Sequence, residues 1–512
     1  MSGGRRRLPA VAAAALVFGS IVVFSRLSLA DEAWFLHVVS RVASGDVLYR
    51  DVFFGATPLS VYAALAPVAA FGADVAWIKL EVVLCFVCSV LIAVRIGRQL
   101  GLIDRLGSLA LLVLALMVWA PPVVGSVYQP LATVCLLACF SLVLDWIDRA
   151  GPSLSRAELG ALVLAAAAAA LAFASKHNVG LLAFAALLGS VALAGPPSPL
   201  RAPAGRAAVS AGVFAVLSAA LLVPVALSGA TAALVKDGLT GKGDYLHVAG
   251  TLYLDEFVAL ASLLKPGGKS DVTHDPGLFY WRVPFLLVPL LLVALPIAWS
   301  KGGPTERRRT VVVALFALAA AVAVFPGTVT HLRFVAAALV LAAGYVASRV
   351  ATRDKPRRVA AAKVALAIWL VPGVVVLAVV PAYRIATGER RLSELPRFRG
   401  AFAPPARQRR LLRNSRELRR ADHDGRLFLL TPDASFYYSS AGLRDPTPFG
   451  MSQSTIFGRT GQAETIGRIE RGELRVCARF DRSSKLNPEE LERFVESRLR
   501  PARALGACTL YR

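Results

Sequence analysis

The sequence predicts an all-α polytopic membrane protein with about eleven transmembrane helices, interfacial helices in the first outer loop and a small C-terminal α/β domain. Of its 512 residues, 56% are hydrophobic and only 18% are charged. The charges form short clusters between apolar runs of roughly 17 to 23 residues, a length that crosses a bilayer as a helix. Because lipid offers the backbone no water to bind, such runs must be helical.

The apolar runs are similar in length and hold few charges. They cover residues 8–25, 76–94, 107–124, 128–146, 158–175, 179–195, 207–229, 282–299, 310–327, 334–349 and 363–383. The first run follows Arg5, Arg6 and Arg7, as a signal peptide would. No convincing small-residue cleavage site follows it, so we expect it to remain as an anchor.

The distribution of the basic residues predicts the orientation of the chain. The net charge of +24 would suit a nucleic-acid partner, but Lys and Arg are concentrated in alternate loops, as the positive-inside rule requires. This predicts a multi-pass plasma (inner) membrane protein with a cytoplasmic N-terminus and no nucleic-acid partner. The basic loops are 5–7, 95–105, 149–156, 201–206, 301–309 and 349–363.

Two domains are predicted. Residues 1–383 form the membrane domain, with outer loops at 26–75 and 230–281, and residues 384–512 form a soluble domain that we expect outside. Segment 384–420 holds twelve Arg and three acids, which under the same rule would favour the cytoplasm. Large C-terminal domains often escape that rule. A further reading places these arginines against anionic lipid headgroups.

The C-terminal domain is predicted to contain both strands and helices. Residues 426–431 are typical of a buried strand and 505–512 of a closing strand, while 436–449 begin as a helix and 488–499 form an amphipathic helix. Cys477 and Cys508 are its two cysteines. A disulfide between them and two free thiols both remain open. The other four cysteines lie in apolar runs, where buried structural roles are expected.

The first outer loop contains two predicted helices. Residues 32–44, EAWFLHVVSRVAS, alternate apolar and polar side chains at helical spacing, which favours a helix lying in the membrane interface. Gly45 and Asp46 end it. Residues 57–72 are apolar, too short to span easily and interrupted by Pro67. A second surface helix is the preferred interpretation, and a short transmembrane hairpin is the alternative.

Three acidic residues of this loop are candidates for catalysis. Asp31 and Glu32 follow the first span directly, and two carboxylates at a bilayer surface are costly unless they have a use. They suit a general base or a metal ligand. The alternative is that they cap the next helix. Asp51 is the third candidate, with a turn residue or a partner of Arg50 as its alternative.

Two short cationic clusters are expected at the same membrane face. Lys176, His177 and Asn178 lie between two apolar runs, and His331 and Arg333 begin another. Positive charge outside runs against the topology rule, so a phosphate ligand would explain it. A plain interfacial loop is the alternative reading.

The second outer loop offers weaker signals. Asp255 and Glu256 are adjacent, and DVTHDP at 271–276 has spacing compatible with a divalent ion, but such mixtures are common in ordinary loops. GKGD at 241–244 lacks the strand, the spacing and the Ser/Thr of a nucleotide-binding loop and is expected to be a turn. We therefore predict no metal site from the sequence.

The order of these features resembles the C-type (GT-C) membrane glycosyltransferases that use polyprenyl-phosphate sugars, among them the lipid A aminoarabinose transferases and protein O-mannosyltransferases. The resemblance covers the topology but is specific mainly over 31–62. HLRFVAAALVLAAGY, from His331, is similar to a late span of that superfamily, and LRDPTPF, from Leu443, to a motif of some bacterial members. The motifs of the first outer loop are Asp31-Glu32, Gly45, Tyr49-Arg50-Asp51, Pro58-Leu59 and Tyr62.

Two departures leave the subfamily open. Relatives often carry a double proline where this chain has Thr57-Pro58, and a second surface helix richer in aromatic residues than Tyr62 and Phe71.

The resemblance implies a cell-envelope enzyme that transfers a hexosyl or pentosyl group, with inversion, from a polyprenyl-phosphate donor to an acceptor hydroxyl at the outer face. Asp31 would be the base, and Glu32 and Asp51 would support it or hold an ion. The acceptor would be a glycan, a lipid or a protein, and a divalent cation cofactor is left open. Lys176, His177, Arg333 and His331 would bind the donor phosphate, and Tyr49, Tyr62 and Asn178 the substrate.

Two other classes compete with this reading. A transporter or flippase would place ionisable groups near the bilayer midplane and show related halves. This chain places them at the outer face, with Lys79 and Glu81 as exceptions within a span. A non-catalytic cell-envelope assembly protein would use the basic C-terminal domain to bind partners.

Overall fold

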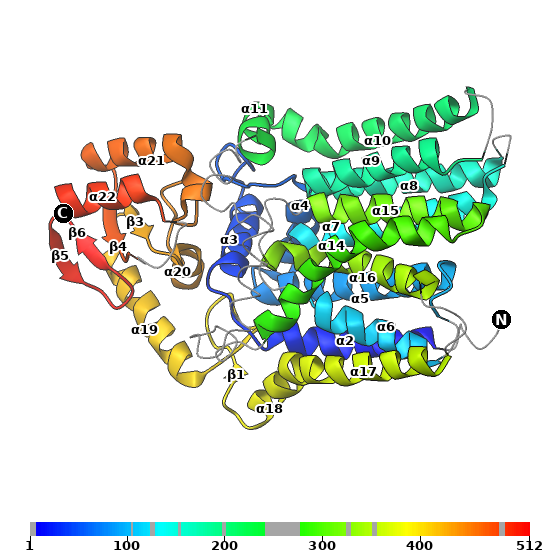
Figure 1. The fold of residues 1–512 in the computed structure, drawn as a ribbon. Helices are drawn as coiled ribbons and strands as arrows, with labels where there is room; N and C mark the ends of the chain where they lie inside the picture. The colour runs from blue at the N-terminus through cyan, green and yellow to red at the C-terminus, as the bar shows by residue number, and fades with distance from the viewer. Residues whose placement is uncertain are drawn as a thin grey trace.

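The computed structural model describes residues 7–103, 106–122, 128–151, 155–196, 201–240, 277–323, 329–350, 356–480 and 487–512. Long helices run side by side in a bundle, and a smaller mixed domain lies beyond one end of it (Figure 1). The first described helix, α2 (Leu8–Phe24), begins at the opposite end of the bundle from that domain. Most of the second outer loop, including the acidic pair and the DVTHDP segment, lies outside the described residues.

Each of the eleven apolar runs overlaps a helix of the bundle, and residues 123–124 and 324–327 of two runs lie outside the described residues. In chain order these are α2 (Leu8–Phe24), α5 (Val75–Gln99), α6 (Leu106–Trp119), α7 (Tyr128–Arg149), α8 (Arg156–Ser175), α9 (His177–Leu193), α10 (Arg201–Leu227), α14 (Gly277–Ser300), α15 (Pro304–Ala323), α16 (Val329–Val350) and α17 (Pro356–Val374), which continues through the π-helical η3 (Val375–Val379) into α18 (Val380–Ala386).

Within the described residues, seven helical stretches are long and apolar enough to cross a membrane. Helices α2, α6 and α9 are shorter, and α15 begins with the charged residues Glu306–Arg309. The helical membrane architecture predicted from the sequence is therefore present. The number of crossings stays a prediction.

Helix α7 packs against α5, α8 and α9 in the middle of the bundle. Its Phe140 stacks on Phe316 of α15 with ring centroids 4.7 Å apart. Helices α8 and α9 approach closely where they meet, because a Cβ at Gly180 would lie 2.0 Å from the backbone nitrogen of Phe173. Small residues permit such contacts between helices in lipid. This close approach fixes the α8–α9 turn that carries Lys176.

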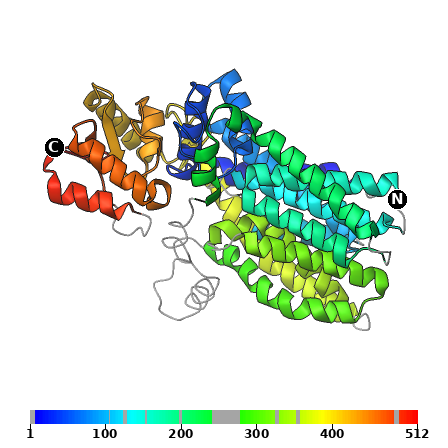
Figure 2. The same cartoon turned by 90° about the horizontal axis from the view of Figure 1, so that it is seen from above.

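Helix α3 (Asp31–Ala43) lies across the end of the bundle, and α4 (Leu59–Phe71) packs against it (Figures 1 and 2). Both helices occur where the sequence predicts them. Nine consecutive residues of α3, Glu32 to Ser40, are buried. A helix resting freely on a membrane would keep one side exposed. Helix α3 is buried on all sides because α4 and the C-terminal domain cover it. Such covering by distant segments cannot be predicted from hydrophobic periodicity.

The C-terminal domain contains a four-stranded sheet of order β3-β4-β6-β5. Its strands are β3 (Leu427–Leu430), β4 (Arg475–Ala478), β5 (Pro501–Ala504) and β6 (Thr509–Tyr511). β3 and β4 are parallel, so a crossover through α20 (Ala434–Ala441) and α21 (Ser454–Glu470) connects them. The remaining elements are α19 (Pro405–Ala421), α22 (Glu489–Arg498) and a small antiparallel pair, β1 (Arg391–Leu392) with β2 (Phe402–Ala403).

The predicted strands near 426–431 and 505–512 and the helices near 436 and 488–499 are present as β3, β6, α20 and α22. β4, β5, α19 and α21 were not predicted, because short or highly charged segments give weak periodicity. Cys477 of β4 and Cys508 form a disulfide, which resolves the alternative left open by the sequence.

Replacing Cys508 with serine is expected to lower the free energy of unfolding by about 3–4 kcal/mol, since the disulfide closes a loop of 31 residues in the unfolded chain. Thermal unfolding of the purified full chain measures this loss, and replacing the exposed free Cys88 with serine is the matched control. Non-reducing peptide mapping that recovered Cys477 and Cys508 as free thiols would contradict the pairing.

Candidate active site

A buried ion pair joins three helices at the end of the bundle next to the C-terminal domain (Figure 1). Lys79 of α5 lies 2.8 Å from Glu32 of α3, and both side chains are almost completely buried. The Lys79 ammonium also donates to the carbonyl oxygens of Val23 and Arg26, each at 2.7 Å. Glu32 accepts from the backbone N–H of Ser28 at 3.1 Å. The carbonyl of Val23 belongs to the last turn of α2, which leaves it without a helical partner, and that of Arg26 follows just after the helix.

The role of Glu32 is therefore positional in this structure. Its carboxylate is bound by Lys79 and Ser28, so it is not open to a substrate. It fixes the start of α3 against α2 and α5. The partner was not identified from sequence, although Lys79 stood out as a charge inside an apolar run.

Asp31 has a different environment from its neighbour. It is half-buried, and among the described residues its carboxylate has neither a hydrogen bond nor an ion pair. Burial raises the pKa of Asp31 to about 7, and the adjacent Glu32 carboxylate adds to the rise. Asp31 is not the N-cap of α3, because the N-cap is Ala30 and no side chain caps the helix, although both acids lie in its first turn. A carboxylate whose pKa lies near neutral pH suits a general base.

Aromatic contacts connect α3 to the N-terminal end of α7. Trp34 stacks on Phe54 at 5.6 Å, and Phe54 meets Tyr128 edge-on at 5.9 Å. The Lys176 ammonium lies 5.7 Å from the centre of the Tyr128 ring. Asp31 precedes Trp34 by three residues and so lies on the same side of α3. Trp34, on this side of α3, is linked through Phe54 and Tyr128 to Lys176.

The α8–α9 turn presents Lys176 in an extended conformation between two helices. The side chain of Lys176 is buried, and His177, which begins α9, is half-buried. Asn178 donates to the carbonyl of Ala323 at 2.7 Å and accepts from the N–H of Val179 at 3.1 Å. Asn178 thus ties the turn to α15, which favours a structural contribution over the substrate contact expected for it.

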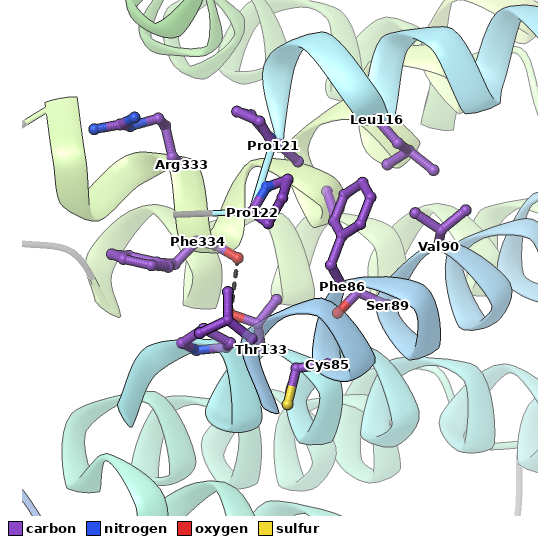
Figure 3. Close-up of a pocket in the computed structure, with 14 residues that line it drawn as sticks. Cys85, Phe86, Ser89, Val90, Leu116, Pro121, Pro122, Thr133, Arg333 and Phe334 are labelled. Carbon is purple, nitrogen blue, oxygen red and sulfur yellow. Dashed lines mark hydrogen bonds between the residues drawn. The ribbon is translucent and has the colours of Figure 1, made fainter. Parts of the chain in front are cut away.

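A mostly apolar pocket lies between α5, α6, α7 and α16, with Arg333 at its edge (Figure 3). Its cavity volume is about 40 Å³, and it opens to the surroundings. Thr133 donates to the carbonyl of Phe334 at 2.8 Å and so fixes the start of α16 against α7. Its walls include Val82, Cys85, Phe86, Leu116, Pro130 and Ala337. An apolar wall with a cation at its edge suits a lipid chain that ends in an anion.

Two of the predicted cations are each associated with the first residues of α7. Lys176 lies over Tyr128, the first residue of α7, while Arg333 and Pro130 line the same pocket. The first turn of α7 holds no acidic residue. A helix N-terminus carries partial positive charge, so it reinforces both cations as an anion site.

Three of the other predicted site residues are Tyr49, Tyr62 and His331. Tyr49 is buried, donates to the carbonyl of Ala56 at 2.6 Å and adopts a φ of 71°. Burial raises the pKa of Tyr49 well above its usual value. Tyr62 lies half-buried on α4. The side chain of His331 lies outside the described residues.

Asp51 forms the turn predicted as its alternative role. It accepts from the N–H of Val47 at 2.9 Å and pairs with Arg50 at 3.0 Å. The hydrogen bond from Arg50 lowers the pKa of Asp51. A half-buried carboxylate held in this way supports the loop. In the described part of the chain, no group of three or more His, Cys, Asp or Glu residues has the arrangement of a metal site.

The C-terminal domain contacts α3 through residues that sequence reasoning did not single out. His37 lies 3.1 Å from Asp445 and stacks on Tyr438, and all three are buried. Arg41 donates to the carbonyl of Thr447 at 2.7 Å. Asp445 and Thr447 belong to the LRDPTPF motif noted in the sequence, but the sequence does not show that this motif contacts α3.

Solved structures show the same fold as this chain. ArnT from Cupriavidus metallidurans, bound to undecaprenyl phosphate, is 14% identical with a TM-score of 0.58, and the match covers 100% of this chain and 98% of that one. The archaeal oligosaccharyltransferase AglB from Archaeoglobus fulgidus, in complex with an inhibitory peptide and a dolichol-phosphate, is 11% identical with a TM-score of 0.54, covering 93% and 70%. No protein-family model and no curated protein sequence matches the chain.

This chain therefore shares the fold of the ArnT and AglB structures, in agreement with the fold that the resemblance predicted. At these identities the likeness establishes the fold alone.

Replacing Lys79 with methionine is expected to lower the free energy of unfolding by about 3–5 kcal/mol, because it leaves the Glu32 carboxylate buried without its partner. Thermal unfolding of the purified protein measures the loss. Adding Glu32→Leu to this variant should recover much of it, because the buried charge is then removed as well. Lys301→Met, at an exposed position, is the control. Unchanged stability in Lys79→Met would contradict the role assigned to the pair.

Proposed function

We propose that the protein is a glycosyltransferase that moves a sugar from a polyprenyl-phosphate donor to an acceptor hydroxyl at the outer face of the membrane. The observation that carries this proposal is the Asp31 carboxylate, half-buried and without a hydrogen-bonding partner in the described chain, beside its tightly paired neighbour Glu32. The shared fold supports it, since the solved ArnT and AglB structures hold undecaprenyl phosphate and dolichol-phosphate.

Asp31 acts as the base in the proposed reaction. Its carboxylate takes the proton of the acceptor hydroxyl as the hydroxyl oxygen attacks the anomeric carbon. The bond from that carbon to the phosphate oxygen breaks on the opposite face, and its electron pair leaves with the phosphate. Attack and departure on opposite faces invert the anomeric carbon.

The departing polyprenyl phosphate gains negative charge during this step. Lys176 and Arg333, with the N-terminus of α7, are the proposed groups that stabilise it. Fixed cations in a site of low dielectric stabilise developing charge without having to reorganise. The apolar pocket beside Arg333 would receive part of the lipid chain, which explains why such an enzyme is embedded in the membrane. His177 and His331 remain candidates for the same phosphate.

We further propose that residues 1–383 form the membrane domain with a cytoplasmic N-terminus, and that residues 384–512 form a domain outside. The arrangement of the chain supports this, since the start of α2 and the C-terminal domain lie at opposite ends of the bundle. The Cys477–Cys508 disulfide is also typical of an oxidising compartment. The acceptor is a molecule with a nucleophilic hydroxyl that reaches Asp31 from that side.

Replacing Asp31 with asparagine is expected to lower kcat by roughly 10²- to 10⁴-fold, because the base is lost while the shape is kept. Release of polyprenyl phosphate from candidate lipid-linked sugars measures the rate. Thermal unfolding should show that the variant is as stable as the wild type. Asp148→Asn, at the far end of α7, is the matched control. A fully active Asp31→Asn enzyme would remove this carboxylate from the mechanism.

The pH dependence follows from the pKa of Asp31, which is about 7. Only the ionised carboxylate accepts a proton, so kcat/KM should rise about tenfold per pH unit below pH 7 and level off above it. The residual activity of Asp31→Asn should lack this inflection. A wild-type profile that is flat between pH 5 and pH 8 would contradict the assignment.

Replacing Arg333 with glutamine is expected to lower kcat by roughly 10²- to 10³-fold, because a fixed charge no longer stabilises the leaving phosphate. Steady-state transfer rates with one lipid-linked donor measure the effect. Arg349→Gln, at the other end of α16, is the control for loss of a charge from this helix. Equal rates in the two variants would argue against a phosphate site at Arg333.

A further inference from the structure

The segment that follows the last helix of the bundle is strongly basic and has few acidic partners. Residues 384–420 hold twelve arginines, of which ten are exposed and two are partly buried. Among the described residues only one of them, Arg384, has an acidic group within 4 Å, the carboxylate of Glu389 at 3.7 Å. Such an excess of positive charge requires anions nearby, either from salt or from a binding partner.

The first part of this segment is attached to the outer ends of two helices. Arg390 donates to the carbonyl of Ser25, which ends α2. The carbonyl of Arg397 accepts from the N–H of Val75, the first residue of α5, at 2.9 Å. Asp74, the N-cap of α5, accepts from the N–H of Arg399 at 3.2 Å. Backbone bonds thus hold these arginines at the level where α2 and α5 end.

Gly400 fixes the same attachment, because a Cβ there would lie 2.3 Å from the Cβ of Ala76 on α5. Arg397 adopts a φ of 65°, a conformation that glycine accommodates more easily than arginine. Position 397 thus has an arginine although its left-handed backbone conformation favours glycine.

Exposed apolar side chains accompany the arginines. Tyr383 of α18 is 63% exposed and Leu392 of β1 is 57% exposed. Aromatic side chains at the ends of spanning helices lie at the headgroup level of a membrane. Arginine beside tyrosine and leucine, at the end of a helical bundle, is the composition of a surface that rests on lipid.

Like charges also crowd Arg390. Burial lowers the pKa of Arg390, and the guanidinium groups of Arg384, Arg26 and Arg407 lower it further. An anion placed among these side chains would relieve that repulsion.

We propose that Arg384, Arg390, Arg391, Arg397 and Arg399, which we call the arginine collar, bind the headgroups of anionic phospholipids in the leaflet at this end of the bundle. The sequence allowed the whole of 384–420 to lie on lipid. The structure restricts the contact to the collar, because α19 leads away from the bundle toward the strands (Figure 1). The collar would hold the last spanning helix and the C-terminal domain in a fixed position at the membrane surface.

The test is a lipid titration of the purified full chain in a neutral detergent. Added phosphatidylglycerol is expected to raise the Tm of the wild type well above the effect of phosphatidylcholine, and high salt should reduce that gain. The variant R391Q/R397Q/R399Q removes three exposed guanidinium groups and keeps the backbone bonds. For half of the maximal rise in Tm, this variant should need on the order of a hundredfold more phosphatidylglycerol than the wild type.

The control R498Q/R500Q/R503Q removes the same charge at the end of the C-terminal domain far from the bundle, and it should respond as the wild type does (Figure 1). Glycerophosphoglycerol and inorganic phosphate, which carry the anion without acyl chains, should give no comparable gain. Stabilisation by either of them would indicate a phosphate site in place of a lipid contact. If the triple variant does not fold, R391Q alone is titrated.

A wild type that responds equally to both lipids, or a collar variant that responds fully, would overturn the proposal. The measurement needs no sugar transfer, so its result is independent of the proposed catalytic function.

Discussion

The last turn of the first spanning helix leaves carbonyl groups without helical partners, and the site depends on how these are satisfied. Lys79 reaches from α5 to the carbonyls of Val23 and Arg26 and pairs with Glu32 at the start of α3. Two charges removed from water in this way are tolerated only when their geometry is good and their remaining bonds are made. The resulting junction of three helices sets the position of Asp31.

Adjacent carboxylates acquire different roles from their surroundings. Glu32 points to an ammonium group and is bound in the structure, whereas Asp31 has no partner among the described residues, so burial raises its pKa to about 7. One residue along a helix turns the side chain by about 100°. Because of this rotation, Glu32 reaches Lys79 and acts as a positioning residue, whereas Asp31 remains the candidate base.

The C-terminal domain is part of the environment of this site. His37 and Asp445 meet in a buried contact, and Arg41 binds the backbone at Thr447, so α3 is held between the bundle and the domain. A helix fixed on both sides keeps a catalytic group in position more accurately than a surface helix would. The arginine collar, at the end of the bundle, would secure the same domain to the membrane surface.

The sequence by itself determined the helical membrane architecture, the helices near 32–44 and 57–72 and several elements of the C-terminal domain. These depend on the length and periodicity of apolar runs, which are local properties of the chain. It also pointed to Asp31, Lys176 and Arg333 through charges in unexpected places. Only the tertiary structure decided which of the acids is paired, that α3 is covered and that Asp51 forms a turn. Partners such as Lys79 for Glu32 and Asp445 for His37 lie far apart along the chain, and no local pattern encodes such pairings.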